Sequence, residues 1–329
     1  MKSPANLYII YKQQLTIFCP LDLKEMNTFQ LKLANEDPLV SSIEPLREMA
    51  AYEALWEDYG VTFKKIAELF ASRPGSLPSE IVPQDKILSF VKILADLFQQ
   101  NATKKPGILL NNTFDYPAKL RAAKHPIELL YYLGDLGLIK TRSVAVVGSR
   151  KATPEGKRRT AQLVRDLVKD KFTIVSGLAA GIDSEAHRNA IEQGGKTIAV
   201  IGTPLDEYYP VENKNLQDEI AKNHLVVSQV PFYRYRHQDY RHNKGFFPER
   251  NKTMSALTEA TIIVEASDTS GTLYQATAAI QQGRKLFILD SCFENKDITW
   301  PIRFEHQAIR VKNYSDIQSA LIQDVISTD

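Results

Sequence analysis

Short apolar runs alternate with stretches of helical period through the second half of the chain. Between the runs, apolar residues recur three and four positions apart, as in Ala161, Val164 and Leu167. Strands buried on both faces read as continuous apolar runs, and their alternation with helices implies crossovers in a parallel sheet. The pattern therefore predicts an α/β domain with a doubly wound, mainly parallel sheet, whose binding crevice lies at the carboxyl ends of the strands. The predicted strands begin at Val144, Phe172, Thr197, Leu225, Thr261 and Lys285.

The first hundred residues show helical periodicity without strong strand signals. Phe63, Ile66, Leu69 and Phe70 form one apolar face of such a segment. We expect a small helical domain over residues 1–100, followed by the α/β domain over 101–329, which ends in a short helix starting near Ser315. A stretch broken by prolines leads from one domain into the sheet of the other.

Composition narrows the class of protein. The chain is 43% hydrophobic and 24% charged with a formal net charge of +2, as expected of a globular protein whose nucleic-acid affinity depends on local clusters of charge. No apolar run approaches the roughly 20 residues that span a bilayer, and the N-terminus lacks the small-residue cleavage site of a signal peptide, so we expect a cytoplasmic protein without membrane contact. Cys19 and Cys292 are interpreted as core residues, with a nucleophilic role as the alternative. His237 and His242 lack partners for a metal site, and no metal is expected.

The loop after the predicted strand that begins at Val144 combines several anion-binding features. Gly148, Ser149 and Arg150 follow the strand, and Thr153 is placed to cap a helix that begins at Pro154. Backbone amides, a helix N-terminus and a guanidinium group all attract phosphate. An ordinary strand–helix turn is the alternative interpretation.

Two further loops reach the same edge of the predicted sheet. After the second strand, Ser176, Gly177 and Gly181 allow close approach of the backbone, and Asp183 is interpreted as a helix N-cap rather than a catalytic acid. His187 is interpreted as a structural histidine.

The loop after the fifth strand offers Ser270, Gly271 and Thr272 at another helix start. Glu265, which precedes them, is interpreted as a structural anchor. Its alternatives are a catalytic carboxylate and an acceptor for a ribose hydroxyl. A carboxylate beside a phosphate would repel it unless paired with an arginine.

A basic and aromatic stretch lies before the fifth strand. Cations mixed with rings are what a single-stranded polynucleotide requires, since cations follow the phosphates and bases stack on the rings. The alternative is an exposed hairpin with locally packed rings and solvated arginines. The cations are Arg234, Arg236, Arg241, Lys244, Arg250 and Lys252, and the rings are those of Phe232, Tyr233, Tyr235, Tyr240, Phe246 and Phe247.

Taken together, these loops resemble the DprA (Smf) family of DNA-processing proteins over roughly residues 115 to 290. The matching segments, in the family's order, are VAVVGSR, SGLAAGIDSEAH, GGKTIAVIGTPLDEYYP, the strand ending VVSQVP, FPERN and VEASDTSGTL. The resemblance implies an extended Rossmann fold and a protein that binds single-stranded DNA without catalysis or cofactor, protects it and loads a RecA-like recombinase during natural transformation. It also implies a homodimer. The implied DNA pocket is lined by Arg150, Lys244, Phe247, Arg250 and Asn251.

The sequence departs from the family at several points. KTMSAL follows FPERN, and Tyr274 and Gln275 follow SGTL. We also expect no winged-helix-like domain after the sheet. A specialised role in a mobile element or a defence system therefore stays open.

Two other functions are carried as alternatives. One is a nucleotide phosphoribohydrolase of the LOG type, because the segment SGTLYQ resembles a loop of those enzymes. Gln275 stands where those enzymes have a catalytic glutamate, and glutamine cannot act as a general base. The other is a sensor that holds a nucleotide-derived ligand in the same crevice.

Overall fold

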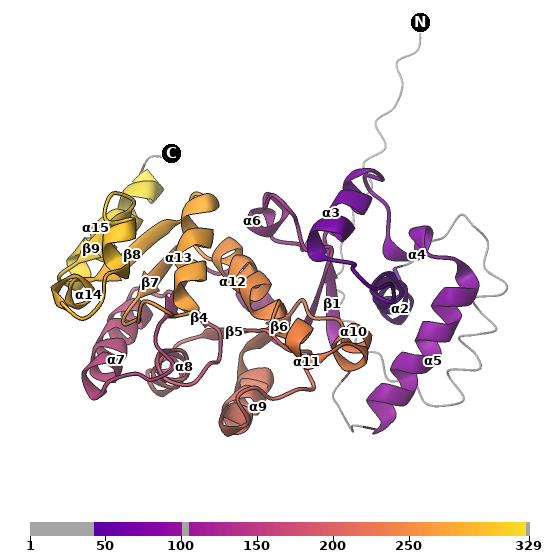
Figure 1. The fold of residues 1–329 in the computed structure, drawn as a ribbon, viewed down its shortest axis with the longest axis horizontal. Coiled ribbons are helices and arrows are strands. Elements are labelled where there is room, and N and C mark those ends of the chain that lie inside the picture. Colours follow the sequence, from indigo (N-terminus) through magenta and orange to yellow (C-terminus); the bar gives the residue numbers. More distant parts are fainter. Residues whose placement is uncertain (1–42, 101–104, 327–329) are drawn as a thin grey trace, which may run out of the picture. The chain divides into compact units, whose positions relative to one another are not determined.

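A sheet of nine strands organises the protein (Figure 1). The computed structural model describes residues 43–100 and 105–326. The strand order is β1-β2-β6-β5-β4-β3-β7-β8-β9. The strands are β1 Gly107–Leu110, β2 Leu129–Gly134, β3 Ser143–Val147, β4 Thr173–Ser176, β5 Thr197–Ile201, β6 Leu225–Ser228, β7 Ala260–Ile263, β8 Lys285–Leu289 and β9 Ala308–Val311.

The six strands predicted from apolar runs are β3 to β8, and all neighbours among them pair in parallel. Every residue of β3, β4, β5, β6 and β7 is buried, which explains why these strands read as uninterrupted apolar runs. The predicted fold class is confirmed.

The remaining strands lie at the edges of the sheet and were not predicted. β1 and β2 form a hairpin-like antiparallel pair, and β2 also runs antiparallel to β6. β9 extends the opposite edge in parallel with β8. β1, β2 and β9 are only partly buried, in contrast to β3 to β7.

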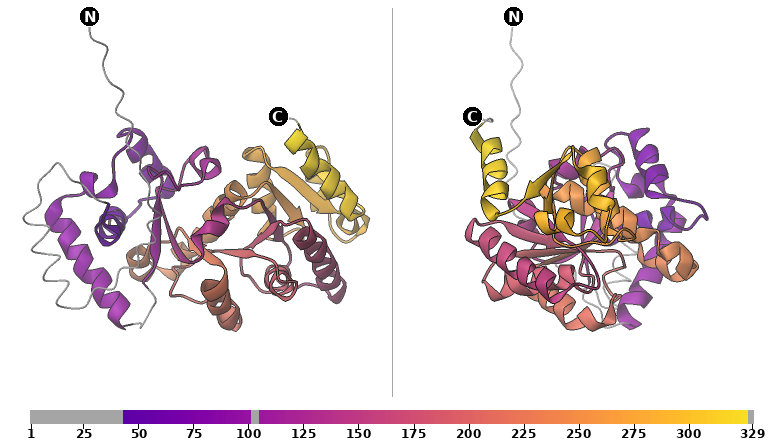
Figure 2. Two further views of the ribbon diagram at one scale, coloured as in Figure 1. Left: turned by 180° about the vertical axis from the view of Figure 1, so that it is seen from behind. Right: turned by 60° about the vertical axis from the view of Figure 1, so that its left-hand side comes forward.

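Helices cover both faces of the sheet (Figures 1 and 2). Side chains of α7, α8 and α15 form one apolar cluster with β3, β4, β7, β8 and β9. α12 and α13 cover the other face. The bounds are α7 Pro154–Lys169, α8 Ile182–Glu192, α9 Lys214–Asn223, α10 Phe232–His237, α11 Tyr240–Asn243, α12 Phe246–Leu257, α13 Thr272–Gln281, α14 Asp290–Glu294 and α15 Tyr314–Ile326. Short 3-10 helices span Leu136–Lys140, Val211–Asn213 and Trp300–Phe304.

Within residues 43–100, four helices precede the sheet, and a short helix follows β1. These are α2 Pro45–Leu55, α3 Phe63–Ala71, α4 Pro78–Ile81, α5 Gln84–Gln100 and α6 Ala118–Arg121. The predicted periodic segment is α3, whose Phe63, Ile66 and Phe70 are buried and whose Thr62 accepts a hydrogen bond from the Lys65 amide at 3.3 Å. The terminal helix starts one residue before the predicted Ser315.

Aromatic rings connect these first helices to the sheet. Tyr52 of α2 packs edge-on against Tyr131 of β2 at 6.4 Å between ring centroids, and Tyr131 packs against Phe232 of α10 at 5.0 Å. Trp56 reaches Phe246 of α12 at 6.4 Å. Such edge-to-face pairs add about 1 kcal/mol each to the burial of the rings. Residues from 43 onward form one compact unit, and the predicted domain boundary at residue 100 stays a prediction.

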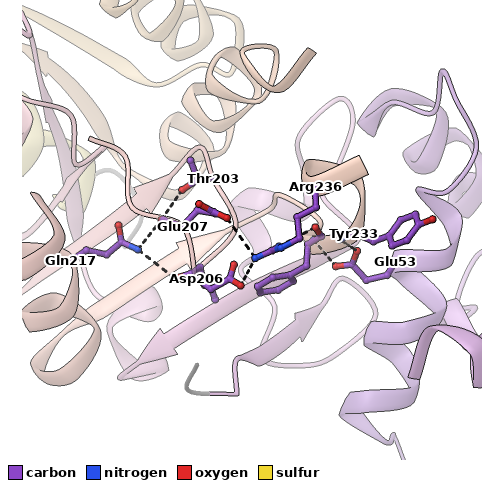
Figure 3. A network of polar contacts seen from close by, with 9 residues as sticks. Glu53, Thr203, Asp206, Glu207, Gln217, Tyr233 and Arg236 are labelled. Carbon is purple, nitrogen blue, oxygen red and sulfur yellow. Dashed lines mark hydrogen bonds and ion pairs between the residues drawn. The ribbon is translucent and has the colours of Figure 1, made fainter. Parts of the chain in front are cut away.

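A buried carboxylate on α2 fixes the start of α10 (Figure 3). Glu53 accepts hydrogen bonds from the Tyr131 hydroxyl at 2.6 Å and from the amides of Phe232 and Tyr233 at 2.8 and 2.9 Å. Burial raises the pKa of Glu53 to about 7, although these hydrogen bonds and Arg236 oppose the shift. The same carboxylate therefore serves as N-terminal cap and as a titrating group inside the protein.

The other end of α10 is held by Arg236, which donates to the Phe232 carbonyl at 3.1 Å and pairs with Asp206 and, at 3.6 Å, with Glu207 (Figure 3). The backbone of Glu207 accepts in turn from Thr203 at 3.2 Å. The loop after β5 and α10 are thus joined in one polar network.

The two cysteines and the absence of a membrane span are the subject of further expectations. Cys292 is buried and burial raises the pKa of its thiol to about 12, in agreement with the interpretation as a core residue. Cys19 and the rest of the first 42 residues lie outside the described residues. Within the described residues, no helix is both long enough and apolar enough to cross a bilayer.

The titration of Glu53 predicts a dependence of stability on pH. Because its pKa is higher in the folded chain than in the unfolded chain, its contribution to stability is present below about pH 4.5 and is lost as pH rises through about 7. We expect the unfolding free energy of the wild type, relative to that of Glu53→Gln, to fall by roughly 2 kcal/mol between pH 5 and pH 8. Urea unfolding of both proteins at a series of pH values measures this difference, and a constant difference would contradict the assignment.

Candidate nucleic-acid interface

The topology places a pocket at the carboxyl ends of β3 and β7. The chain leaves β3 toward β4 on one side and returns to β7 on the other, which makes this the point where a doubly wound sheet forms its ligand crevice. A pocket of about 980 Å³ opens there, which we call the β3–β7 pocket. Loops after β3 and β7, the start of α8 and the first turns of α12 line it. Among its lining residues are Gly148, Ser149, Arg150, Phe247, Arg250, Asn251, Ser270, Gly271 and Thr272.

The loop after β3 is held by hydrogen bonds to both neighbouring loops. The Ser149 amide donates to the Glu265 carbonyl at 2.7 Å, and the Ile182 amide donates to the Ser149 carbonyl at 3.1 Å. A Cβ on Gly148 would lie 2.6 Å from a side-chain carbon of Ile182 and 2.7 Å from the Glu265 carbonyl oxygen, so only glycine fits there. The expectation that the amide after Gly148 holds a phosphate is therefore wrong for Ser149, whose amide already has a partner.

Arg150 follows this fixed backbone and is exposed. Within the described part of the chain its guanidinium group has no hydrogen-bonding or ion-pair partner. The same holds for the ammonium group of Lys151, which also lines the pocket and which the sequence analysis missed. Its position next to Arg150 in the sequence could have indicated that it belongs to the site. The helix beyond begins at Pro154 with Thr153 as its cap, as predicted, and the Thr153 hydroxyl accepts from the Gly156 amide at 2.9 Å.

The loop after β4 lies mostly behind the pocket and contributes Ala179 to its lining. The Ser176 hydroxyl donates to the Val146 carbonyl at 2.7 Å, and Gly177 is buried. Gly181 has a φ of 82°, and a Cβ there would lie 2.2 Å from the Ser149 carbonyl oxygen. Ser176, Gly177 and Gly181 thus shape the loop after β3 without lining the pocket.

Asp183 is not the N-cap of α8, because the helix begins at Ile182 after Gly181. Its carboxylate accepts instead from the amides of Gly177 and Ala179 at 3.2 and 3.4 Å. Burial raises the pKa of Asp183, while Arg250 and these amides oppose the shift. Asp183 is therefore a structural carboxylate that faces a buried cation.

Arg250 forms the floor of the pocket and is only 5% exposed. Its Nη1 donates to the carbonyls of Gly177 and Val200 at 2.6 and 2.7 Å, and its Nε donates to Asn251 at 2.9 Å. Burial lowers the pKa of Arg250 to about 10, Asp183 opposes the shift and Arg150 adds to it. The backbone holds most of this guanidinium group, and only Nη2 is without a described hydrogen bond.

The ring of Phe247 is half-buried at the edge of the pocket. A Cβ on Gly202 would lie 2.7 Å from this ring, so the glycine after β5 makes room for it. The half-exposed ring of Tyr209 lies 5.3 Å away between centroids. Asn251 donates to the Gly271 carbonyl at 3.3 Å and so connects α12 with the loop after β7.

In the loop after β7, the Ser270 hydroxyl accepts from the Thr272 amide at 3.2 Å, and the Thr272 hydroxyl donates to the Gly148 carbonyl at 3.1 Å. Glu265 accepts from the amide and the hydroxyl of Thr153 at 3.1 and 2.5 Å, which confirms it as an anchor of the loops. The ring of Tyr274 lines the pocket and is 64% exposed. It is a second residue that the sequence analysis did not assign to the site.

Most of the basic and aromatic stretch has structural partners, and the expected row of free cations and rings is wrong. Phe232 and Phe246 are buried, Arg234 is 9% exposed, and Lys252 pairs with Glu249 at 2.6 Å. The stretch folds as α10, α11 and the start of α12 rather than as a hairpin. Phe246 packs against Trp56 and against Phe63 of α3, which are distant in sequence. Phe232 and Tyr233 pack against two rings of α5.

Lys244 lies apart from the β3–β7 pocket. It is exposed, does not line the pocket, and its ammonium group lies 4.7 Å from the centroid of the Tyr240 ring. A role for it in the site stays a prediction.

Two polar side chains near the site are structural. His187 is buried, its Nδ1 lies 2.6 Å from the Thr197 hydroxyl, and burial lowers its pKa to about 3. The predicted structural histidine is confirmed. Gln275 is 1% exposed, and its amide and the Thr261 hydroxyl form a hydrogen bond of 3.2 Å.

Comparison with known proteins identifies relatives of this arrangement. A "DNA processing protein DprA" of Streptococcus pneumoniae is 42% identical over 174 residues, which are 53% of this chain and 59% of the relative. This chain spans between 48% and 64% of the lengths of three relatives, of which two are named DNA processing protein DprA and one Protein Smf.

Solved structures agree with the sequence comparison. The X-ray structure of DprA from S. pneumoniae superposes with a TM-score of 0.65 at 28% identity, covering 85% of this chain and 98% of the other. A structure of DNA processing protein A from Helicobacter pylori, described through its unique single-stranded DNA binding mode, superposes with a TM-score of 0.57 at 33% identity, covering 67% of this chain and 97% of the other. The family described as DNA recombination-mediator protein A matches residues 107–321, which contain the whole sheet and every loop of the pocket. The chain therefore belongs to the DNA recombination-mediator protein A family, that is, to the DprA/Smf proteins.

Proposed function

We propose that this protein binds single-stranded DNA in the β3–β7 pocket. The observation that carries the proposal is the pair Arg150 and Lys151, two neighbouring cations with no described partner on a loop fixed from both sides. Phosphates contact these groups, and Nη2 of Arg250 supplies a further donor at the floor. The rings of Phe247 and Tyr274 accept bases by stacking.

The charge balance of the pocket favours an anionic ligand. Its lining cations are Arg150, Lys151, Arg159 and Arg250, and its lining carboxylates are Glu155, Asp183 and Glu265. Arg159 pairs with Glu155 at 3.1 Å, while Asp183 and Glu265 accept hydrogen bonds from protein groups. The charges that remain for a ligand are positive.

We also propose that the protein binds DNA without catalysing a reaction. Gln275 occupies the position of the glutamate in LOG-type hydrolases, and its buried amide is engaged with Thr261. The proposed activity is binding and protection of single strands and loading of a RecA-like recombinase by a homodimer, in keeping with the family. A hydrolase would instead release free base from a nucleoside monophosphate, and chromatography of such a reaction distinguishes the two.

We expect tighter binding of an oligo(dT) of about 20 nucleotides than of a duplex of equal length, with affinity that falls steeply as salt rises. Arg150→Ala removes one phosphate contact, so the slope of log K against log salt should decrease by about 0.7. Fluorescence anisotropy at several salt concentrations measures both quantities. Arg165→Ala, on the exposed side of α7, is the matched control and should leave the slope unchanged.

Equal affinity for duplex and single strand would contradict the proposal. Tight binding of a mononucleotide, with no gain from a longer strand, would favour the sensor.

A second variant tests base stacking. Phe247→Ala should weaken oligo(dT) binding by 1–3 kcal/mol, roughly 5- to 150-fold, because base–aromatic stacking is lost, and it should leave the salt slope unchanged. Phe114→Ala, which truncates a fully exposed ring outside the pocket, serves as the control. Thermal unfolding of both variants checks that the fold is intact, and an unchanged affinity in a folded Phe247→Ala protein would remove Phe247 from the site.

A further inference from the structure

A second and larger pocket lies on the other side of α12. It has a volume of about 1340 Å³ and is lined by the segment joining α2 to α3, by α6 and the residues after it, and by α12 and the end of α13. We call it the α3–α6–α12 pocket, and Figure 1 locates these helices beside one another. None of the residues predicted from the family motifs to bind DNA lines it.

The two pockets share α12 as a wall. Phe246, Glu249, Thr253 and Ala256 follow one face of the helix at spacings of three and four and line the α3–α6–α12 pocket. The adjacent face lines the β3–β7 pocket with Phe247, Pro248, Arg250, Asn251 and Met254. A ligand in one pocket is thereby separated from a ligand in the other by a single helix.

Positive charge exceeds negative charge in the lining of the second pocket. Lys119, Lys124 and Arg284 line it, and none of them forms an ion pair within residues 43–100 and 105–326. Glu249 is the one carboxylate among the described lining residues, and Lys252 already pairs with it at 2.6 Å. The pocket therefore attracts anions.

Arg284 carries an unsatisfied donor. Its Nε is buried and reaches no acceptor in the described structure, and Nη2 makes only a long hydrogen bond of 3.4 Å to the Ala256 carbonyl. Burial lowers the pKa of Arg284. Burial also lowers the pKa of Lys119, Glu259 opposes that shift, and Arg284 and Arg142 add to it. Two like charges that disfavour each other gain most from a shared anion.

Another part of the lining is aromatic. The Tyr59 ring is 75% exposed, the Arg234 guanidinium lies 4.9 Å from its centroid, and the His242 ring meets it edge-on at 5.9 Å. Trp56, Phe63 and Phe246 also line the pocket, but they are buried and pack edge-on against one another. A planar aromatic ligand would therefore stack on the exposed Tyr59 ring, in the way that bases stack on exposed rings.

We propose that the α3–α6–α12 pocket is a binding site for a nucleoside phosphate, with the phosphate held by Lys119, Lys124 and Arg284 and the base against the Tyr59 ring. Two ligands share this chemistry: a free mononucleotide, and a nucleotide of a DNA strand that passes beyond the β3–β7 pocket. Binding of the strand rests on the proposed function, whereas binding of the free mononucleotide does not.

The two tryptophans of the chain provide a local readout. Trp56 lines the α3–α6–α12 pocket, whereas Trp300 lines neither pocket. Incorporation of 5-fluorotryptophan gives one ¹⁹F resonance for each, assigned with Trp300→Phe. Titration with dAMP should shift the Trp56 resonance to saturation and leave that of Trp300 in place. Separate titrations with oligo(dT) of 6 and about 20 nucleotides test the strand as the source.

Charge reversal at two exposed lysines tests the phosphate contacts. Lys119→Glu/Lys124→Glu should weaken the response of Trp56 at least tenfold. The control Lys196→Glu/Lys222→Glu makes the same charge change at exposed positions that line neither pocket, and it should have no comparable effect. Arg150→Ala should leave dAMP binding at Trp56 unchanged, so failure of the β3–β7 pocket as a DNA site is distinguishable from failure of this one.

A Trp56 response to dAMP supports the mononucleotide, and a response to the longer oligo(dT) alone supports the strand. The proposal is overturned if neither dAMP nor oligo(dT) moves the Trp56 resonance, or if the control reversal weakens the Trp56 response as much as the reversal at Lys119 and Lys124 does. A polyglutamate peptide serves as a polyanion without bases, and a Trp56 response to this peptide alone would also overturn the proposal.

Discussion

The hydrogen bond from the Ser149 amide to the Glu265 carbonyl is the contact on which the β3–β7 pocket depends. It joins the loops after β3 and β7, the two strands between which the topology opens its crevice. The Glu265 side chain extends the same connection to Thr153, and a glycine at position 148 lets the loops approach. Arg150 and Lys151 therefore leave a backbone that is already fixed, and a phosphate need not order the loop when it binds.

The arginines of this protein divide by what their surroundings provide. Arg250 and Arg236 are engaged with backbone carbonyls and carboxylates, and they stabilise loops and helix ends. Arg150 has no described partner and remains available to a ligand. A buried guanidinium that meets carbonyl oxygens shapes a pocket, while an exposed one beside it supplies the charge that a polyanion meets.

Helix α12, which contains the FPERN segment, contributes residues to both pockets. One of its faces presents Phe247 and Arg250 to the β3–β7 pocket, and the next presents Glu249 to the cationic pocket beside α3 and α6. The segment between α2 and α3 and the start of α3 complete the lining of that second pocket. Glu53 and the aromatic rings of α2 hold these helices against β2 and α10.

Periodicity, turn residues and helix caps are local properties, so the six central strands, the loop after β3 and the Thr153 cap could be predicted from the sequence. Which polar side chains stay free depends on how distant elements pack together. The sequence shows that Arg250 belongs to the FPERN segment, but its burial against the carbonyls of Gly177 and Val200 depends on β4 and β5. The edge strands and the rings of the basic stretch likewise depended on partners far along the chain. A local pattern reports which residues are adjacent, whereas solvent exposure is set by the elements that pack against them.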